Sequence, residues 1–254
     1  MFWSTTQLGR AIRRKHPCQK PEERCCAAAT AIDNDRFLVV GGHTDTILFD
    51  ESCRVYDTRT RKWSKDWPDL NIGRRGHTCV TTNNKVYVIG GCGYKKGSLD
   101  SIEVLDLSES TPRWRILPQR LKHKRSCYAA ATLEDPSKVI VVGGLNKNGD
   151  LASCEIVCLE QGQEGQTRTV PSLMTPRCEL SLVAVENRFL VAVGGKCNRW
   201  EHLSLVEVLD LAAAPEEQRW RSLPSMRTAR YGCTAFFLQG TTKLWLRAGA
   251  APRT

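Results

Sequence analysis

A glycine cluster follows a short apolar segment in the first half of the chain, and such a cluster could hold a phosphate group. Residues 85–89 read Lys-Val-Tyr-Val-Ile, which is typical of a strand, and Gly90, Gly91 and Gly93 follow. A dinucleotide-binding loop needs the spacing G-x-G-x-x-G, and a P-loop needs Gly-Lys-Ser or Gly-Lys-Thr. Here the next glycine is Gly97, one residue too far, and neither P-loop tripeptide occurs. The spacing favours another role for these glycines.

Histidine and cysteine residues show no arrangement typical of catalysis or metal binding. The five histidines stand at positions 16, 43, 77, 123 and 202, and no two have the i, i+4 spacing of a helical metal site. His77 and Cys79 share a strand face, as do Cys154 and Cys158, but no C-x-x-C motif accompanies either pair. No G-x-S-x-G motif is present. The sequence therefore predicts no catalytic residue, no metal ligand and no cofactor.

The glycine pair is part of a repeat. The same strand-plus-glycine segment occupies residues 36–42, 85–91, 138–144 and 188–195, ending in Gly41 and Gly42, Gly90 and Gly91, Gly143 and Gly144, and Gly194 and Gly195. The first glycines, at 41, 90, 143 and 194, are 49, 53 and 51 residues apart. An arginine precedes each copy, at 24, 75, 125 and 177, and a fifth stands at 230 before a degraded copy that ends in Ala248 and Gly249. A repeat of this period predicts an array of similar units.

Each repeat contains four strand-like segments and no helical periodicity. The second segment, such as residues 38–40, is a continuous apolar run, and a strand of this kind must be covered on both faces. Sheets that pack face to face around an axis satisfy that need. Tryptophans at positions 63, 114 and 220, each followed by a proline, indicate the outermost strand. We expect the glycines, the repeat arginines, Trp63, Trp114 and Trp220 to be structural.

In this combination of arginine, apolar strand, Gly-Gly, tryptophan and proline at a period near 50, the sequence resembles the kelch-repeat family of β-propellers. The resemblance implies an all-β fold with the arginine-initiated strand innermost and the tryptophan-bearing strand outside. We expect four complete four-stranded blades at 24–74, 75–124, 125–176 and 177–229, and a partial fifth at 230–249. Residues 1–23 would form a basic N-terminal segment and 250–254 a tail. Either a five-bladed closure, with an outer strand near Trp3, or a truncated six-bladed ring fits this count.

The composition is that of an ordinary globular protein, with 41% hydrophobic and 25% charged residues. No run of eighteen apolar residues occurs, so we expect no membrane span. The twelve cysteines come without a recognisable secretion signal, which favours free thiols and a cytoplasmic or nuclear location. Cys26, Cys79, Cys127 and Cys233 are expected to be packing residues. The net charge of +10 favours acidic partners, but no block of five basic residues indicates a nucleic-acid groove.

The resemblance also implies a binding surface, because kelch domains that capture peptides use residues just after the repeat arginine and just after the glycine pair. In this sequence those residues are Ser126 and Tyr231 after the arginines, and His43, Tyr94, Lys95, Lys96, Asn146, Lys147, Arg199 and Trp200 after the glycine pairs. Basic and aromatic side chains of this kind are enriched in interfaces. The resulting hypothesis is a non-catalytic scaffold that binds an acidic peptide or loop of another protein.

Two other interpretations remain open on the sequence alone. Some kelch-like propellers are enzymes, so the same basic cluster could serve a carbohydrate or a small anion. The chain could also be a truncated fragment of a larger ubiquitin-ligase adaptor of the BTB or F-box type, because the first 23 residues are too few for either domain. An incomplete ring would expose apolar sheet faces and favour self-association.

Overall fold

The computed structural model describes residues 23–198 and 200–237, and the backbone of 244–247. Trp3, Arg199, the pair Ala248 and Gly249, the tail 250–254 and all but the last residue of the 1–23 segment lie outside this range. The described residues contain no helix and form strands, turns and irregular segments. The all-β prediction is therefore confirmed for this part of the chain.

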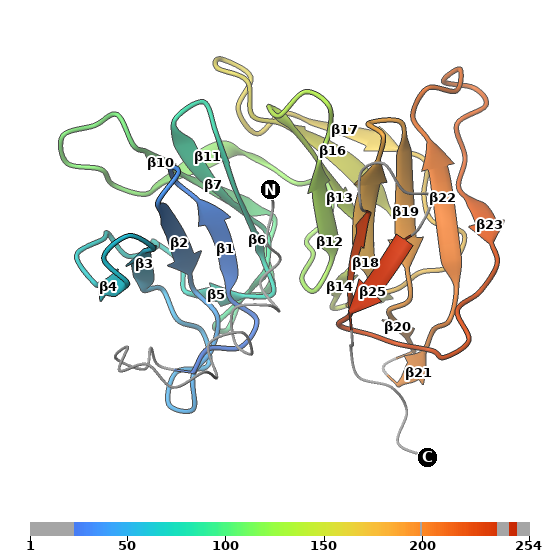
Figure 1. Ribbon diagram of the computed structural model, residues 1–254, viewed down its shortest axis with the longest axis horizontal. Helices are drawn as coiled ribbons and strands as arrows, with labels where there is room; N and C mark the ends of the chain where they lie inside the picture. Colours follow the sequence, from blue (N-terminus) through green and yellow to red (C-terminus); the bar gives the residue numbers. More distant parts are fainter. Residues whose placement is uncertain (1–22, 199, 238–243, 248–254) are drawn as a thin grey trace. The chain divides into compact units, whose positions relative to one another are not determined.

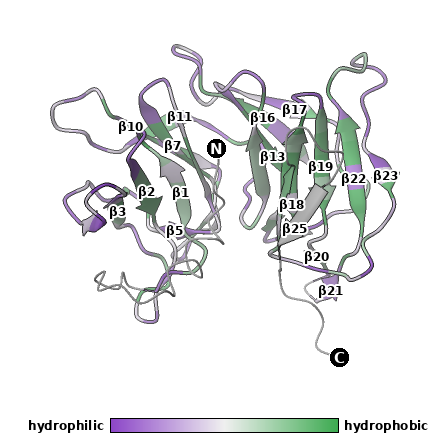
Figure 2. Cartoon of the chain, in the orientation of Figure 1, coloured by the Kyte–Doolittle hydropathy of each residue, from purple (hydrophilic) through white to green (hydrophobic). Residues whose placement is uncertain are grey.

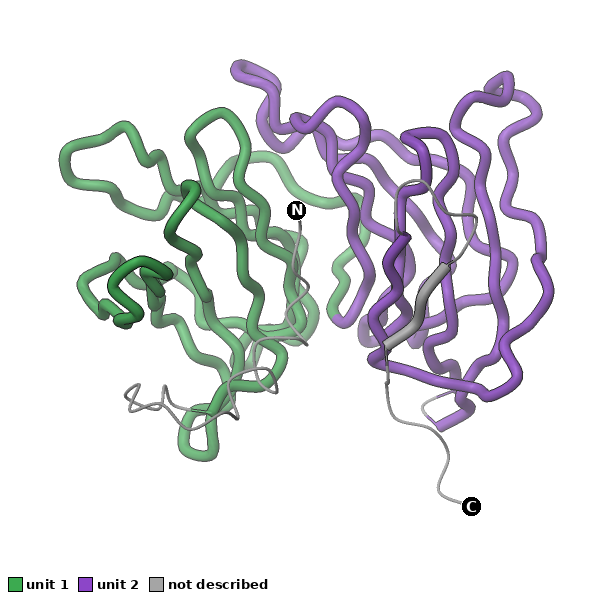
Figure 3. The backbone as a smooth tube through the Cα atoms, in the orientation of Figure 1, with its two compact units in different colours: residues 1–126 green, residues 127–254 purple. Residues whose placement is uncertain are grey.

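The chain folds into two compact units, residues 1–126 and residues 127–254 (Figure 3). Unit 1 contains two four-stranded antiparallel sheets (Figure 1). Sheet 1 consists of β1 (Ala28–Ala31), β2 (Arg36–Val40), β3 (Cys53–Asp57) and β4 (Lys62–Ser64), in that order. Sheet 2 consists of β6 (Thr78–Thr82), β7 (Lys85–Ile89), β10 (Ser101–Asp106) and β11 (Arg115–Arg120). A small sheet is formed by β5 (Arg74–Arg75), β8 (Cys92–Gly93) and β9 (Gly97–Ser98).

Unit 2 repeats this design. Sheet 3 consists of β12 (Ala129–Thr132), β13 (Lys138–Val142), β16 (Cys154–Cys158) and β17 (Thr167–Val170). Sheet 4 consists of β18 (Ser181–Val185), β19 (Phe189–Val193), β22 (Val206–Asp210) and β23 (Arg221–Leu223). Two hairpins extend from these sheets: β14 (Leu145–Asn146) with β15 (Gly149–Asp150), and β20 (Lys196–Cys197) with β21 (Glu201–His202). The last pair is β24 (Thr234–Phe237) with β25 (Leu244–Arg247).

The sheets of each unit pack face to face, as the continuous apolar strands predicted. In unit 1, Leu38 and Val40 of sheet 1 share a buried cluster with Val86 and Val88 of sheet 2. In unit 2, sheets 3 and 4 share the cluster of Ile140, Val142, Leu190 and Ala192, among other residues. Figure 2 shows β13, β19 and β22 in the hydrophobic colour along most of their length. The strands β7, β13 and β19 bury side chains on both faces, whereas β2 buries only Leu38 and Val40, on the face that packs on sheet 2.

The tryptophans join one sheet to the sheet before it. Trp114 of sheet 2 is buried, and its indole Nε1–H donates to the carbonyl oxygen of Pro68 in sheet 1 at 3.0 Å. Trp220 of sheet 4 makes the same bond to Pro171 of sheet 3 at 2.9 Å. Both prolines follow the last strand of their sheet. The indole therefore acts as a connection between sheets, in addition to its packing.

Trp63 takes the equivalent place in sheet 1, where no preceding sheet is described. The strand register places Trp63 opposite Tyr56, and its ring packs against Tyr56 and Phe37, with centroid distances of 5.0 and 5.9 Å. Its buried Nε1–H has no hydrogen-bond partner among the described residues. In sheet 3, Thr167 occupies this position, opposite Val157, which explains why no tryptophan occurs in that repeat.

We predict that Trp114→Phe lowers the free energy of unfolding by about 1 kcal/mol more than Trp63→Phe, because only Trp114 donates a hydrogen bond, to the partly buried carbonyl of Pro68. Chemical denaturation followed by circular dichroism measures both values. Equal losses in the two variants would show that the indole hydrogen bond contributes nothing to the packing of the sheets.

Candidate functional site

The glycine pairs adopt a backbone conformation that residues with a Cβ atom rarely take. Both glycines of every pair have positive φ, for example 59° and 99° at Gly41 and Gly42. A Cβ at Gly41 would lie 2.6 Å from the carbonyl oxygen of Arg74, and one at Gly194 would lie 2.5 Å from that of Arg230. The pair thus allows the backbone of one sheet to touch the backbone of the next.

A hydrogen bond fixes this contact. The N–H of Gly42 donates to the carbonyl of Arg74 at 2.8 Å, and the N–H of Gly91 donates to that of Arg125 at 2.9 Å. In unit 2, Gly144 and Gly195 make the same bond to Arg177 and Arg230 at 2.9 and 2.8 Å. Each glycine pair is therefore bonded to the main chain of the arginine that comes next in the repeat.

The arginine side chains hold together the strand ends of their own sheet. The Nη1 of Arg74, a residue with no exposed surface, donates to the carbonyl oxygens of Gly90 at 2.8 Å and Ser101 at 3.3 Å. Arg177 is equally buried and bonds the carbonyls of Gly194 and Leu205 at 3.2 and 3.3 Å. One guanidinium thus joins the end of the second strand to the start of the third.

The buried guanidiniums of Arg74 and Arg177 each have a buried carboxylate partner that the sequence analysis missed. Arg74 pairs with Glu103, and Arg177 pairs with Glu207. Glu103 also accepts bonds from the backbone N–H groups of Asn71 and Ile72, in the segment that enters the sheet. The signal was present in the sequence, because Glu103, Glu155 and Glu207 are spaced by 52 residues each and all three are buried.

Sheet 1 departs from this pattern. Arg54 stands where the other repeats have glutamate, since Ser52 precedes it by two residues as Ser101 precedes Glu103. Arg24 instead pairs with Asp50 at 2.9 Å and bonds the carbonyls of Gly41 and Ser52. A carboxylate from the loop therefore replaces the one from the third strand.

The assignment of Arg75 as the repeat arginine was wrong by one residue. Arg74 makes the buried contacts and provides the carbonyl that the glycine pair binds. Arg75 turns to the surface instead, where its guanidinium carbon lies 5.0 Å from the ring centroid of Phe49. Two adjacent arginines cannot be distinguished by spacing alone, because repeat lengths vary by a few residues.

Within each unit, a main-chain contact also links successive repeats at the position two residues after the arginine. Cys26, Gly76, Cys127, Glu179 and Gly232 all have φ between 51° and 61°. The N–H of Gly76 donates to the carbonyl of Cys26 at 2.9 Å, that of Glu179 to Cys127 at 2.7 Å, and that of Gly232 to Glu179 at 2.8 Å. Only two of these positions are glycines, so the sequence did not reveal the feature.

The glycine pairs lead into loops that carry most of the predicted binding residues. Tyr94, Lys95 and Lys96 form the tip of the hairpin β8–β9, and Lys147 lies at the tip of β14–β15. Asn146 is in β14, and its Oδ1 accepts the N–H of Asn148 at 2.8 Å. Trp200 is at the tip of β20–β21 with 83% of its surface exposed. Arg199, its neighbour, lies outside the described residues.

In unit 1 these loops form a continuous row of cationic and aromatic side chains. The ring of Phe49 lies 6.2 Å from that of Tyr94, between centroids, and the Nζ of Lys95 lies 5.2 Å from the Tyr94 centroid. Since Arg75 also contacts the Phe49 ring, two neighbouring rings connect one cation to another. Leu48 and Tyr94 are 61% and 64% exposed. We call Ile47, Leu48, Phe49, Arg75, Tyr94, Lys95 and Lys96 the unit 1 loop surface.

Two predicted residues of unit 1 lie apart from this surface. Ser126 is buried, with 2% of its surface exposed, and its hydroxyl is 3.1 Å from that of Ser98. The expectation that Ser126 contacts a partner therefore does not hold, because its side chain faces the hairpin base. His43 is half-buried and its backbone pairs with Cys25. The sequence analysis missed Phe49 and Arg75, which stand at other points of the repeat.

In unit 2, Tyr231 lies within a group of side chains after the glycine pair of sheet 4. The Nζ of Lys196 is 5.1 Å from the Tyr231 ring centroid and pairs with Glu179 at 2.7 Å. The ring of His202 lies 4.6 Å from that of Tyr231. Because the charge of Lys196 is already neutralised by Glu179, this group offers less cationic surface than that of unit 1.

The cysteines within the described residues form no disulfide, and several thiols are held in the neutral form. Burial raises the pKa of Cys53 to about 12, and burial followed by a hydrogen bond to Glu201 raises that of Cys197 to about 11. Cys79 and Cys233 are buried as predicted, whereas Cys26 is exposed and is not a packing residue. Within the described residues, no three side chains of His, Cys, Asp or Glu gather as metal ligands would. No helix there could cross a membrane.

Stacked four-stranded sheets with this arginine–glycine junction define a kelch-type β-propeller. The comparison with family models agrees, since the model described as the KLHDC2/KLHL20/DRC7 Kelch-repeats domain matches residues 26–246. The chain therefore belongs to the kelch-repeat family.

Curated relatives and a solved structure support this placement. Putative adagio-like protein 2 of Oryza sativa subsp. japonica is 30% identical over 181 residues, which are 68% of this chain and 28% of that protein. Kelch-like protein 40 of Xenopus laevis is 28% identical over 225 residues, which are 86% of this chain and 34% of the length of that protein. The chain thus spans about a third of the length of these relatives. The solved structure of YjhT matches with a TM-score of 0.70 at 13% identity, and the match covers 89% of this chain and 84% of the YjhT chain. At this identity the likeness shows the fold alone.

We predict that Arg74→Ala destabilises the protein by about 3–5 kcal/mol, because it leaves the buried Glu103 carboxylate without its partner. Arg75→Ala is the matched control and costs about 1 kcal/mol or less, since it removes a surface contact with one ring. Urea denaturation of the two variants measures the difference. If Arg75→Ala were the more damaging change, the assignment of Arg74 as the structural arginine would be wrong.

His77 generates a prediction on pH. Burial, and then the charge of Arg74, lower the pKa of His77 to about 3. In the unfolded chain the pKa is about 6.5, so between about pH 6.5 and about pH 3 only the unfolded chain takes up the proton. Stability is therefore lost as the pH falls through this window, at about 1 kcal/mol per pH unit.

His77→Leu tests this prediction. Leucine is the residue at the equivalent position of sheet 4, because Leu180 lies three residues after Arg177 as His77 lies three residues after Arg74. Denaturation midpoints measured from pH 7 to pH 4 should fall less steeply in His77→Leu than in the unchanged protein. Parallel pH profiles would mean that His77 is not held neutral in the folded state.

Proposed function

We propose that this chain is a non-catalytic protein-interaction scaffold, and that its unit 1 loop surface binds an acidic peptide or loop of another protein. The observation that carries the proposal is the row Arg75, Phe49, Tyr94 and Lys95, in which two neighbouring rings each contact a cation. Membership of the kelch-repeat family supports an interaction role of this kind in general.

The exposed apolar side chains of this surface favour contact with a partner protein over contact with water. Ile47, Leu48 and Tyr94 are 46%, 61% and 64% exposed, in loops that the rigid glycine junction holds in place. Exposed apolar groups that lie together, bordered by charges, are typical of interaction sites. Rings and arginines are also the side chains that most often dominate binding energy. A partner that covers this surface would bury apolar area now in contact with water.

The charge of the surface selects the partner. Arg75, Lys95 and Lys96 contribute three positive charges, and Asp45 in the neighbouring loop contributes one negative charge. An acidic peptide would gain charge-assisted hydrogen bonds from Arg75 and the lysines. Because these side chains are solvated, the attraction would act mainly on the association rate and would weaken with salt. Aromatic or aliphatic residues next to the acidic ones would contact Leu48 and Tyr94.

Charge reversal tests this function. A fluorescent peptide that alternates glutamate with leucine and tyrosine should bind the unchanged protein, and Lys95→Glu combined with Lys96→Glu should weaken binding by about tenfold or more, because two attractions become repulsions. Fluorescence polarisation at two salt concentrations gives the affinity. The thermal midpoint should stay unchanged, since both lysines are exposed.

The matched control reverses the same number of charges elsewhere in unit 1. Lys62 and Lys65 are exposed on or beside the outer strand β4, away from the glycine pairs in the sequence. Lys62→Glu combined with Lys65→Glu should reduce the affinity by no more than about twofold, through net charge alone. If the control weakened binding as much as the test variant, the unit 1 loop surface would not be the binding site.

A further inference from the structure

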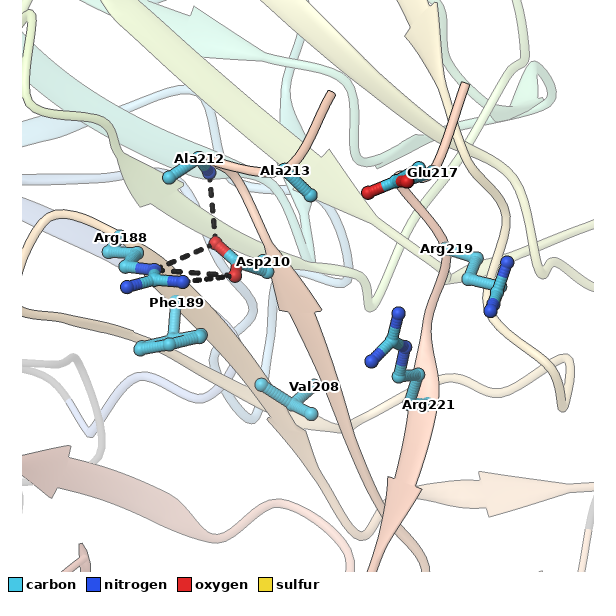
Figure 4. Close-up of a pocket in the computed structure, with 9 residues that line it drawn as sticks. All are labelled: Arg188, Phe189, Val208, Asp210, Ala212, Ala213, Glu217, Arg219 and Arg221. Atoms are coloured by element: carbon cyan, nitrogen blue, oxygen red, sulfur yellow. Dashed lines mark hydrogen bonds and ion pairs between the residues drawn. The ribbon is translucent and has the colours of Figure 1, made fainter. Parts of the chain in front are cut away.

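A pocket lies on sheet 4, at the end of β19 opposite its glycine pair. Its lining comes from the start of β19, the end of β22 and the segment that leads into β23, and its volume is about 320 Å³. Figure 4 shows Arg188, Phe189 and Asp210 on one side and Arg219 and Arg221 on the other. Phe189 is the first residue of β19, whereas Gly194 follows the last, so the pocket is separate from the loops after the glycine pairs.

One arginine of the pocket is already paired. The guanidinium of Arg188 forms a fork on Asp210, with Nε–Oδ1 at 3.0 Å and Nη2–Oδ2 at 2.7 Å. Asp210 also accepts the N–H of Ala212 at 2.9 Å. The hydrogen bond from Arg188, with smaller contributions that include the charge of Arg221, keeps the pKa of Asp210 below its usual value. The carboxylate is therefore ionised and has its own partners.

The other two arginines have no such partner. Arg219 and Arg221 are exposed, and no acceptor within the described part of the chain bonds either guanidinium. Arg115 of sheet 2 holds the position equivalent to Arg221, because each follows the structural tryptophan and pairs with the third strand. Arg115, however, forms an ion pair with Glu109 of its own loop. The corresponding loop of sheet 4 leaves Arg221 open to a ligand.

The floor of the pocket is apolar where the other repeats are basic. Phe189 pairs with Asp210 in the strand register, and the residues in the same register position of sheets 1, 2 and 3 are Arg36, Lys85 and Lys138. The guanidinium carbon of Arg188 lies 4.7 Å from the Phe189 ring centroid. Val208 and Ala213 complete this floor. A ligand here would meet a ring and aliphatic groups below, and free guanidinium groups at the edge.

From this arrangement we propose that the pocket binds an aryl phosphate, the chemical group of a phosphotyrosine side chain on a partner protein. A volume of about 320 Å³ is at the low end for ligand pockets and suits one side chain better than a cofactor. The phosphate carries a charge of nearly −2 and three acceptor oxygens, enough for the forked donors of both Arg219 and Arg221.

A carboxylate fits the pocket less well. The three arginines that line the pocket outweigh Asp210 and Glu217 by one positive charge, so a phosphate of charge near −2 is attracted about twice as strongly as a carboxylate and offers one more acceptor oxygen. The aromatic ring of the ligand would lie on Phe189 and Val208 and would bury their remaining exposed surface. The bond to phosphate would be made by Arg221 and Arg219, with Arg188 and Asp210 holding the wall in place.

Phenyl phosphate, titrated into the ¹⁵N-labelled full chain, tests the proposal. The Nε–Hε signals of Arg219 and Arg221 should shift with a common dissociation constant. Arg221→Gln should weaken binding by about tenfold, because it removes a charge-assisted, forked donor. Arg115→Gln, at the matched position in sheet 2, should leave the dissociation constant unchanged. Lys95→Glu combined with Lys96→Glu should also leave it unchanged, which separates this site from the unit 1 loop surface.

Two further probes decide the ligand class. Methyl phosphate, which lacks the ring, should bind several-fold more weakly than phenyl phosphate, and Phe189→Leu should remove that difference. Benzoate should bind more weakly than phenyl phosphate. The proposal is overturned if Arg221→Gln and Arg115→Gln weaken binding equally, if neither does, or if methyl phosphate or benzoate binds as tightly as phenyl phosphate. A matching far-ultraviolet spectrum for each variant excludes loss of fold as the cause.

Discussion

The contacts of the arginine that opens each repeat, which is fully buried at Arg74, Arg125 and Arg177, are those on which the rest of the structure depends. Its guanidinium joins two strand ends of its own sheet, and its carbonyl accepts the glycine N–H of the sheet before. A charge without exposed surface is costly unless its partners are complete, so Arg74 and Arg177 each need a buried glutamate and two carbonyls. The first glycine of the pair follows from the same contact, because a Cβ at Gly41, Gly143 or Gly194 would meet the carbonyl oxygen of the next arginine.

This rigid junction explains where the chain can vary. The glycine pair fixes the backbone at the point where each hairpin begins. The hairpin can therefore change in sequence without disturbing the sheets. The three described hairpins carry Tyr-Lys-Lys, Lys-Asn and a tryptophan at their tips. At the other end of sheet 4, the change of a basic residue to Phe189 creates an apolar floor between arginines. Binding properties thus arise at both ends of the strands, on a shared framework.

Much of the fold was readable from the sequence, because spacing reports directly on repeated backbone geometry. The glycine pairs and the continuous apolar strands predicted stacked sheets, and the structure has them. The carboxylates paired with the arginines were missed, although Glu103, Glu155 and Glu207 keep a regular interval. The confusion of Arg75 with Arg74 arose because spacing cannot separate neighbours. The contacts of Arg75 with Phe49, and the burial of Ser126, depend on side-chain direction, which no spacing encodes.

The main-chain bond two residues after each arginine has a consequence for how such a protein can change. Cysteine, glycine and glutamate all occupy this left-handed position, and each takes part in the N–H to carbonyl bonds within the two units. Since the coupling needs no particular side chain, a duplicated or transplanted repeat arrives with its docking geometry already encoded in the polypeptide backbone. Adding or removing one repeat then requires no compensating substitution at this main-chain bond, and the side chains at the position can vary.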